Sequence, residues 1–273
     1  MLSIISITSL DLPALQPYRT LRQPVEHFRA GIFVAEGEKV VRRLIESDLE
    51  ILSALLTPEW LEEYRSLFES HSQQCTVYVA DKNILETIVG YNLHQGIMAM
   101  GKIPSPATLE DVVVRSSEPQ LFVALDGLTN SENIGVAVRN CAAFGVQAVI
   151  VGETSSSPYL RRAVRNSMGT VFKIPIVHSN NLLQALEALR TQHRVKILAA
   201  HPHTEEHVLP QTDCRTNLCL VLGSEGEGIS QQILAACDEA VAVPMHNGVD
   251  SLNVSSASAV FLYEVFRQRS LKH

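Results

Sequence analysis

Three separated segments of the sequence combine glycine with amide, carboxylate and guanidinium side chains. They are Asn133-x-Gly135 followed by Arg139, Gly223-Ser224-Glu225-Gly226-Glu-Gly228, and Pro244-Met245 followed by Ser251-Leu252-Asn253. Glycine lets the backbone approach a ligand closely. The polar side chains add hydrogen-bond donors, acceptors and charge at the same places. Together the segments predict a ligand site.

Taken one at a time, each segment also has an ordinary structural explanation. Asn133 could cap a helix while Arg139 lies in solvent, and the glycine-rich segment could be a surface turn. Ser251 is a natural N-cap for the last predicted helix. Asn133 could instead aim helix amides at an anion, and Asn253 could present its amide to a bound group. These alternatives stay open for each segment alone.

The glycine-rich segment limits the kind of ligand. Its order is GxxGxG, which is neither the dinucleotide pattern GxGxxG nor a Walker lysine loop. Glu225 and Glu227 would repel a pyrophosphate, which argues against nucleoside triphosphates and against a nicotinamide-dependent oxidoreductase. A neutral or cationic ligand fits better, and S-adenosylmethionine, with its sulfonium and amino groups, is one.

The elements that must position these segments are short apolar strands. Strands are predicted over 121–125, 218–222 and 240–243, and each segment follows one of them. Helices are predicted over 133–144, ended by Gly145, and over 254–269, and a helix over 158–168 is followed by a strand over 171–176. This alternation predicts a mostly parallel sheet covered on both faces, with ligands at the carboxyl ends of its strands.

The first third of the chain predicts a separate small α/β unit. Strands are expected over 51–56 and 76–79, and helices over 36–46 and 58–70. Residues 102–120 contain three prolines and no sustained period, so they are expected to be a linker. The predicted division is therefore 1–101, a linker over 102–120, and 121–273.

The composition limits which cellular locations and which kinds of partner are expected. No apolar run is long enough to cross a bilayer, and the scattered odd number of cysteines fits reduced thiols, so a cytoplasmic protein without membrane contact is expected. The net charge of −7 argues mildly against nucleic acid. Basic residues nevertheless gather in two stretches, which include Lys39, Arg42 and Arg43, and Arg161, Arg162, Arg165 and Lys173.

A histidine-rich stretch has the residue types of a metal site. His201, His203 and His207 follow a predicted strand. Their spacing matches no zinc pattern, so no metal is predicted.

In this order, the three segments resemble the SpoU (TrmH) family of RNA 2'-O-ribose methyltransferases, part of the SPOUT superfamily. The resemblance covers 121–269 and includes Arg165-Asn-Ser-Met-Gly169, where Asn166 and Met168 replace the small residues expected. Less specifically, Phe33-Val-Ala-Glu36-Gly37 and His94-Gln95-Gly96 resemble the substrate-binding domain of many members, which is akin to small ribosomal RNA-binding proteins.

The resemblance implies a C-terminal α/β-knot with a deep trefoil, although an unknotted sheet has the better prior from physics alone. It also implies a homodimer that acts on RNA, ribosomal RNA first and transfer RNA next; a catalytically silent RNA-binding protein of the same fold is the alternative. S-adenosylmethionine, which leaves as S-adenosylhomocysteine, would be held by the loops after three strands. The cofactor-binding residues implied are Ala200, His201, Leu222, Gly223, Ser224, Glu225, Gly226, Val243, Met245, Ser251, Leu252 and Asn253.

The catalytic residues implied are Asn133, Arg139, Glu225, Ser251 and Asn253. A guanidinium is almost never deprotonated in a protein. Arg139 is therefore predicted to grip a phosphate and stabilise the nucleophile, in its own or the partner's site, with Glu225 orienting it and the general base left open. The residues predicted to bind RNA are Lys39, Arg42, Arg139, Arg161 and Arg165.

Overall fold

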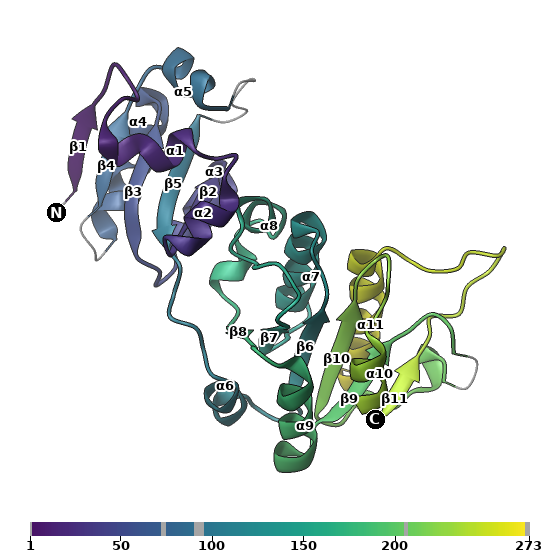
Figure 1. Cartoon of the computed structure of the whole chain (residues 1–273). Helices are drawn as coiled ribbons and strands as arrows, with labels where there is room; N and C mark the ends of the chain where they lie inside the picture. Colours follow the sequence, from purple (N-terminus) through teal and green to yellow (C-terminus); the bar gives the residue numbers. More distant parts are fainter. Residues whose placement is uncertain (1, 72–74, 90–95, 205–206, 271–273) are drawn as a thin grey trace. The chain divides into compact units, whose positions relative to one another are not determined.

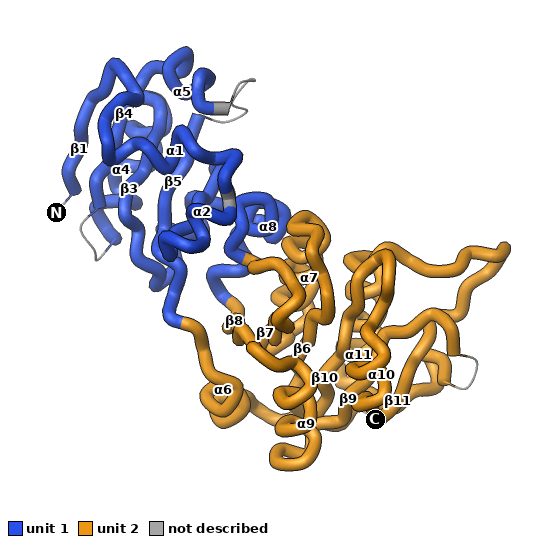
Figure 2. The backbone as a smooth tube through the Cα atoms, in the orientation of Figure 1, with its two compact units in different colours: residues 1–105, 159–173 blue, residues 106–158, 174–273 orange. Residues whose placement is uncertain are grey.

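The computed structural model describes residues 2–71, 75–89, 96–204 and 207–270. The chain forms two compact units, coloured separately in Figure 2. Unit 1 consists of Met1–Ser105 and Tyr159–Lys173, and unit 2 of Pro106–Pro158 and Ile174–His273. The predicted division differs from these units because it keeps Tyr159–Lys173 in the second domain. His94 and Gln95, quoted for the resemblance, lie outside the described residues.

Unit 1 is built on a five-stranded sheet in the order β1-β4-β3-β5-β2 (Figure 1). Strands β1, β4 and β3 are parallel, and β5 is antiparallel to both of its neighbours. The strands are β1 (Ser3–Ser6), β2 (Ile32–Glu36), β3 (Ile51–Leu56), β4 (Thr76–Val79) and β5 (Ile97–Lys102). The helices of this unit include α1 (Gln16–Arg19), α2 (Pro24–Arg29), α3 (Glu38–Ile45), α4 (Pro58–Ser70) and α5 (Lys82–Val89). The predicted bounds of β3, α4 and β4 are confirmed.

The segment Tyr159–Lys173, called the strap below, differs from its prediction. It contains α8 (Arg161–Asn166) and a 3-10 helix, η2 (Thr170–Phe172), instead of a longer helix and the start of a strand. The predicted strand over 171–176 is wrong; only Ile176–His178, β8, is extended. Met168 and Gly169 both have positive φ, of 54° and 78°. This left-handed turn ends the helix and redirects the chain.

Unit 2 is a six-stranded parallel sheet in the order β11-β9-β10-β6-β7-β8. The strands are β6 (Leu121–Asp126), β7 (Ala148–Val151), β8 (Ile176–His178), β9 (Lys196–Ala200), β10 (Leu218–Gly223) and β11 (Glu239–Val241). From β6 the chain moves outward to β7 and β8, whereas from β10 it moves the other way to β11. The crevice at such a reversal is where open α/β sheets bind ligands. The predicted parallel sheet is confirmed.

Helices cover both faces of this sheet (Figure 1). Helices α6 (Leu109–Arg115), α9 (Leu182–His193) and α10 (Gln231–Ala236) share one buried cluster with the strands, and α7 (Ser131–Ala143) packs against α11 (Val254–Ser270). Helix α6 lies within the stretch 102–120 that was predicted to be a linker without a sustained period. The Thr108 hydroxyl oxygen accepts from the Asp111 amide at 3.1 Å to cap it, and Val112 and Val113 are buried.

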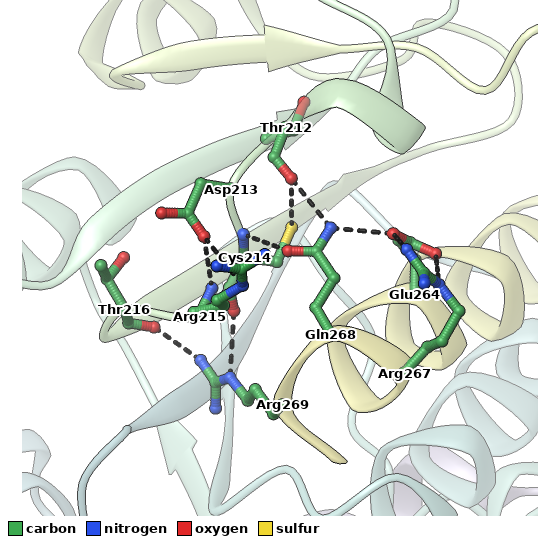
Figure 3. Close-up of polar contacts among 9 residues, drawn as sticks. All are labelled: Thr212, Asp213, Cys214, Arg215, Thr216, Glu264, Arg267, Gln268 and Arg269. Atoms are coloured by element: carbon green, nitrogen blue, oxygen red, sulfur yellow. Dashed lines mark hydrogen bonds and ion pairs between the residues drawn. The ribbon is translucent and has the colours of Figure 1, made fainter. Parts of the chain in front are cut away.

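The last turn of α11 is fastened by two side chains, Gln268 and Arg269, which we call the C-terminal clasp (Figure 3). The Arg269 guanidinium donates to four backbone carbonyl oxygens at 2.6–3.0 Å. They belong to Pro119, Gln120, Cys214 and Thr216. Gln268 donates to the Thr212 carbonyl oxygen and accepts from the Cys214 amide, both at 2.9 Å. The clasp therefore joins the end of α11 to two loops of unit 2.

All five cysteines are free thiols, and most are buried. Among the helices within the described residues, none is long and apolar enough to cross a membrane.

Candidate functional site

The loop after β10 is a tight turn at the reversal point of the sheet. Ser224 and Gly228 exchange two backbone hydrogen bonds of 3.0 Å, which close the loop. A Cβ atom added at Gly223 would lie 2.3 Å from the backbone of Gly228, so only glycine fits there. The Asp126 carboxylate at the end of β6 accepts from the Ser230 amide at 2.7 Å. Two adjacent strand ends therefore hold this loop in one position.

A cavity of about 270 Å³ lies between this loop and the ends of β9 and β11. All of the residues predicted to bind cofactor line it except Asn253. The lining residues that were not predicted are Pro202, His203, Glu227, Gly228, Val241, Val254, Ala257 and Phe261. Val254, Ala257 and Phe261 come from one face of α11, and their i, i+3, i+7 spacing was the signal in the sequence that could have found them.

Asn133, Glu225 and Asn253 form one hydrogen-bonded network, although they are far apart in the sequence. The Asn133 side-chain amide donates to Glu225 Oε1. The Asn253 amide nitrogen donates to the same oxygen at 2.6 Å and to Asn133 Oδ1 at 3.3 Å. The structure thus brings together three of the predicted catalytic residues. Amides from two helix starts hold one carboxylate oxygen, and no bond to Glu225 Oε2 is found among the described residues.

A second cavity, of about 330 Å³, lies on the other side of the Glu225 loop. Its walls are Gly127, Leu128, Thr129, Asn130 and Asn133, together with Ser224 to Glu227 and Val254. Both cavities are lined by Glu225. A group bound in the second cavity would therefore face the first across this carboxylate. The sequence pointed to Asn133 here but not to Thr129 or Asn130.

The caps of the two helices at the site differ from the predictions. Helix α7 begins at Ser131, and its cap is Asn130, whose side-chain oxygen accepts from the Glu132 amide at 2.9 Å. Helix α11 begins at Val254. Asn253 rather than Ser251 caps it, because Asn253 Oδ1 accepts from the Ser255 amide at 2.9 Å. Asn133 is therefore free to use its side chain on Glu225.

Arg139 lies apart from this network in its own chain. It is an exposed residue of α7 and lines neither cavity. Over the part of the chain that the structure describes, it makes no hydrogen bond or ion pair. Within one chain Glu225 is not bonded to Arg139, and its Oε1 accepts from two amides instead, so the prediction that Glu225 orients Arg139 is not met there.

His201 and His203 stand together at the edge of the first cavity. Their ring centroids are 5.8 Å apart in a T-shaped arrangement. Burial, and then the neighbouring His203, lowers the pKa of His201 below its ordinary value. A lowered pKa keeps the imidazole neutral at physiological pH. Among the described residues no group of three His, Cys, Asp or Glu could hold a metal ion.

Apart from Arg139, the residues predicted to bind RNA all belong to unit 1. Arg161 is only 14% exposed and binds the Glu36 carboxylate at 2.6 Å. Arg165 is 53% exposed, and Lys39 is exposed. Arg42 bonds to Glu38 and to the Tyr64 hydroxyl, both at 3.3 Å. Their role toward RNA stays a prediction, and Arg161 already has a partner within the protein.

Comparison with known proteins gives two family matches. Residues 120–263 match the SpoU rRNA Methylase family, and residues 34–107 match the domain described as RNA 2'-O ribose methyltransferase substrate binding. An uncharacterized tRNA/rRNA methyltransferase of Mycobacterium tuberculosis is 30% identical over 100% of this chain and 94% of its own length. The 23S rRNA (guanosine-2'-O-)-methyltransferase RlmB of Escherichia coli is 31% identical over 86% of this chain and 98% of its own.

Solved structures match over nearly the whole chain. A crystal structure of an RNA 2'-O ribose methyltransferase has a TM-score of 0.79 and 27% identity, and covers 98% of this chain and 100% of its own. An AdoMet-bound rRNA methyltransferase from Sinorhizobium meliloti has a TM-score of 0.81 at 23% identity, over 98% and 99% of the two chains. The second likeness concerns the fold.

Proposed function

This chain belongs to the SpoU rRNA methylase family, as the three segments predicted, and from that premise we propose that it methylates a ribose 2'-hydroxyl of ribosomal RNA. The observation that carries this proposal is the Glu225 carboxylate, which lies between two cavities and is held by the amides of Asn133 and Asn253. One cavity suits the methyl donor and the other the nucleotide that receives the methyl group.

The first cavity fits S-adenosylmethionine. Its size is near the lower end of the roughly 300–1,000 Å³ of small-molecule sites. The close approach of Gly223 to the Gly228 backbone fixes the loop that lines this cavity, and the apolar side chains of Leu222, Val243 and Phe261 suit an adenosine body. Glu225 and Glu227 add negative charge at the edge. When bound, S-adenosylmethionine supplies a methyl group on a positively charged sulfonium.

We assign the proton of the ribose hydroxyl to Glu225. As the hydroxyl oxygen bonds to the methyl carbon, the bond from that carbon to the sulfonium sulfur would break and leave a neutral thioether, and the hydroxyl proton would pass to Glu225 Oε2, which would then return it to water. Asn133 and Asn253 keep the carboxylate in place through Oε1, so no reorganisation is needed when the proton moves. A carboxylate is a proper proton acceptor at neutral pH, whereas a guanidinium is not.

We further propose that Arg139 enters this site from a second copy of the chain. The predicted homodimer supplies the reason, since Arg139 lines neither cavity of its own chain. Next to α7, the helix α11 exposes Val260, Tyr263 and Phe266, which are 39–55% exposed. The Phe144 ring packs 6.3 Å from that of Tyr263. An exposed apolar face of this kind on a soluble protein suits a subunit contact, and Arg139 would bind a phosphate there.

Ribosomal RNA is favoured over transfer RNA by the relatives that carry 23S rRNA in their names. A cytoplasmic location and the trefoil knot also belong to this proposal. For the knot, the support is the clasp: the last turn of the C-terminal helix is hydrogen-bonded to loops that come earlier in the chain.

A two-part experiment tests the proposal. Calorimetry measures S-adenosylmethionine binding, and transfer of a labelled methyl group is measured to a 23S rRNA transcript and to bulk transfer RNA. We expect binding and labelled ribosomal RNA in which the modified position resists alkaline cleavage. Binding to RNA without cofactor binding or transfer would instead identify a catalytically silent RNA-binding protein, and labelling of transfer RNA alone would reassign the substrate.

A further inference from the structure

The strap is fixed to unit 1 by an aromatic cluster. The Phe33 ring lies 5.5 Å from that of Tyr159 and 5.2 Å from that of Phe172. Phe33 is 1% and Tyr159 5% exposed. Aromatic pairs at this spacing stabilise by about 0.5–1.5 kcal/mol beyond the area that they bury. The strap is therefore part of the core of unit 1, although the sequence on either side of it belongs to unit 2.

Two arginines complete this attachment. Arg161 Nε and Nη2 donate to Glu36 Oε2 at 3.0 and 2.6 Å, and both side chains are mostly buried. From the other side, Arg43 of α3 donates to the backbone carbonyl oxygen of Met168. These guanidiniums hold the strap in place.

The attachment concentrates positive charge. The strap has four cationic residues and no Asp or Glu. Arg165 Nη1 lies 3.9 Å from Glu36 Oε1, so Glu36 faces Arg161 and Arg165 together. Lys39 lies one helical turn before Arg43 on the same face of α3. The adjacent carboxylate, Glu38, accepts from the Tyr64 hydroxyl at 2.8 Å and from Arg42.

Arg161 and Arg165 thus share the Glu36 carboxylate, and Arg43 of α3 bonds to the same strap, in a chain whose net charge is −7. Such crowding of like charge costs free energy unless an anionic partner relieves it. Arg165 and Lys39 are exposed, so a large anion can reach them. Of the three rings beneath, Phe33 and Tyr159 are buried and Phe172 is partly buried, which leaves bases little to stack on here. The chemistry fits phosphates and not bases.

We infer that the strap and α3 form a phosphate-binding face that grips the backbone of duplex RNA without reading its sequence. Arg165 and Lys39 contact phosphates, and Arg161, through Glu36, is a positioning residue. This inference rests on the proposed function for the identity of the polyanion. It assigns part of the RNA binding to the strap, which lies in the sequence between two stretches of unit 2.

Salt dependence tests the inference with the full chain. The Kd for a 20-base-pair RNA duplex is measured from 50 to 300 mM KCl by fluorescence anisotropy, without cofactor. We expect Lys39→Gln with Arg165→Gln to weaken binding roughly fivefold to tenfold per residue near 0.1 M salt, and to reduce the slope of log K against log salt by about 1 per residue. A duplex of scrambled sequence should behave alike.

The matched control removes two exposed lysines of the same unit, Lys82 and Lys102, each beside a glutamate at 3.9 and 3.2 Å. Lys82→Gln with Lys102→Gln should leave the slope unchanged. Equal slopes for the two double variants, or a binding loss that depends on RNA sequence, would overturn the inference. Thermal unfolding of each variant verifies folding. This experiment measures RNA binding and no methyl transfer. A protein that binds RNA as expected here but transfers no methyl group would contradict the proposed function and still support the phosphate-binding face.

Discussion

At the residue scale, the proposed function depends most on Glu225, which we propose accepts the proton of the ribose hydroxyl. We predict that Glu225→Gln lowers kcat about 10²- to 10⁴-fold, because glutamine keeps an oxygen for the amides of Asn133 and Asn253 but cannot take a proton. Single-turnover methyl transfer measures this change. Formate should partly restore Glu225→Ala, since a small carboxylate can occupy the gap.

The control for this prediction is Glu187→Gln, the same change on an exposed residue of α9, which should have normal turnover. A Glu225→Gln enzyme with near-normal kcat, or a Glu225→Ala enzyme that formate cannot restore at any pH, would remove the proton-accepting role.

One buried and two partly buried histidines predict how stability depends on pH. Burial is the main cause that lowers the pKa of His27, His178 and His201. Between their folded pKa values and about 6.5, the unfolded chain binds more protons, so the free energy of unfolding rises with pH and levels off above that range. Urea denaturation from pH 5 to 8, followed by Trp60 fluorescence, measures the slope. His27→Gln should make it shallower; an unchanged slope would show that His27 contributes nothing.

The residue types were enough to predict which residues form the site, but not which hydrogen bonds they make. Asn133, Glu225 and Asn253 could be predicted as neighbours because all three follow strands of one parallel sheet. That Asn253 caps α11 in place of Ser251 depends on where the helix begins, and boundaries are set by tertiary packing. The partner of Glu225 could not be predicted either, since amides and a guanidinium compete for the same carboxylate.

At the element scale, the C-terminal clasp fastens α11, whose first turns line the cavity that we propose for the cofactor. We predict that Arg269→Ala lowers the free energy of unfolding by about 1–3 kcal/mol, because it removes four hydrogen bonds to backbone carbonyl oxygens, one of them on the buried Cys214. Arg267→Ala, which removes an ion pair of the exposed Arg267 side chain with Glu264, should lower the free energy of unfolding by less. Urea unfolding compares the two, and equal losses would contradict a special role for the clasp.

Elements with strong local signals were predictable, and those set by distant contacts were not. Thr57-Pro58 starts α4 where expected, and Gly145, with φ of 76°, follows α7 as predicted. The apolar run Val171–Phe172 has the composition of a strand, but Phe172 packs on Phe33, more than a hundred residues earlier. No periodicity within the run reports that contact.

At the scale of the whole molecule, the proposed homodimer, in which Arg139 acts in the partner's site, predicts that two inactive variants complement each other. Arg139→Ala and Glu225→Gln should each be inactive. When the two variants are co-expressed with different tags and the mixed dimer is isolated, one site has both residues intact, and about half of the wild-type activity should return. If Arg139 acts within its own chain, the mixed dimer will be inactive. Methyl transfer by the purified mixed dimer distinguishes the two arrangements.

The parallel sheet of unit 2 followed from its alternating pattern, but the membership of the strap in unit 1 did not. Arg161 and Glu36 are 125 positions apart, and no local pattern pairs them. The trefoil knot, which stays a proposal, came from family resemblance, because general folding physics favours an unknotted sheet.

Because unit 1 is made of two stretches, the chain passes between the units after residues 105, 158 and 173. A single recombination point therefore cannot exchange the N-terminal unit between relatives intact. In a chimaera joined only near residue 105, Glu36 and Phe33 would come from one relative and the strap that packs on them from another. We expect natural exchange to have been rare and the two halves to have been inherited as a matched pair, with substitutions at Glu36 and Arg161 occurring together.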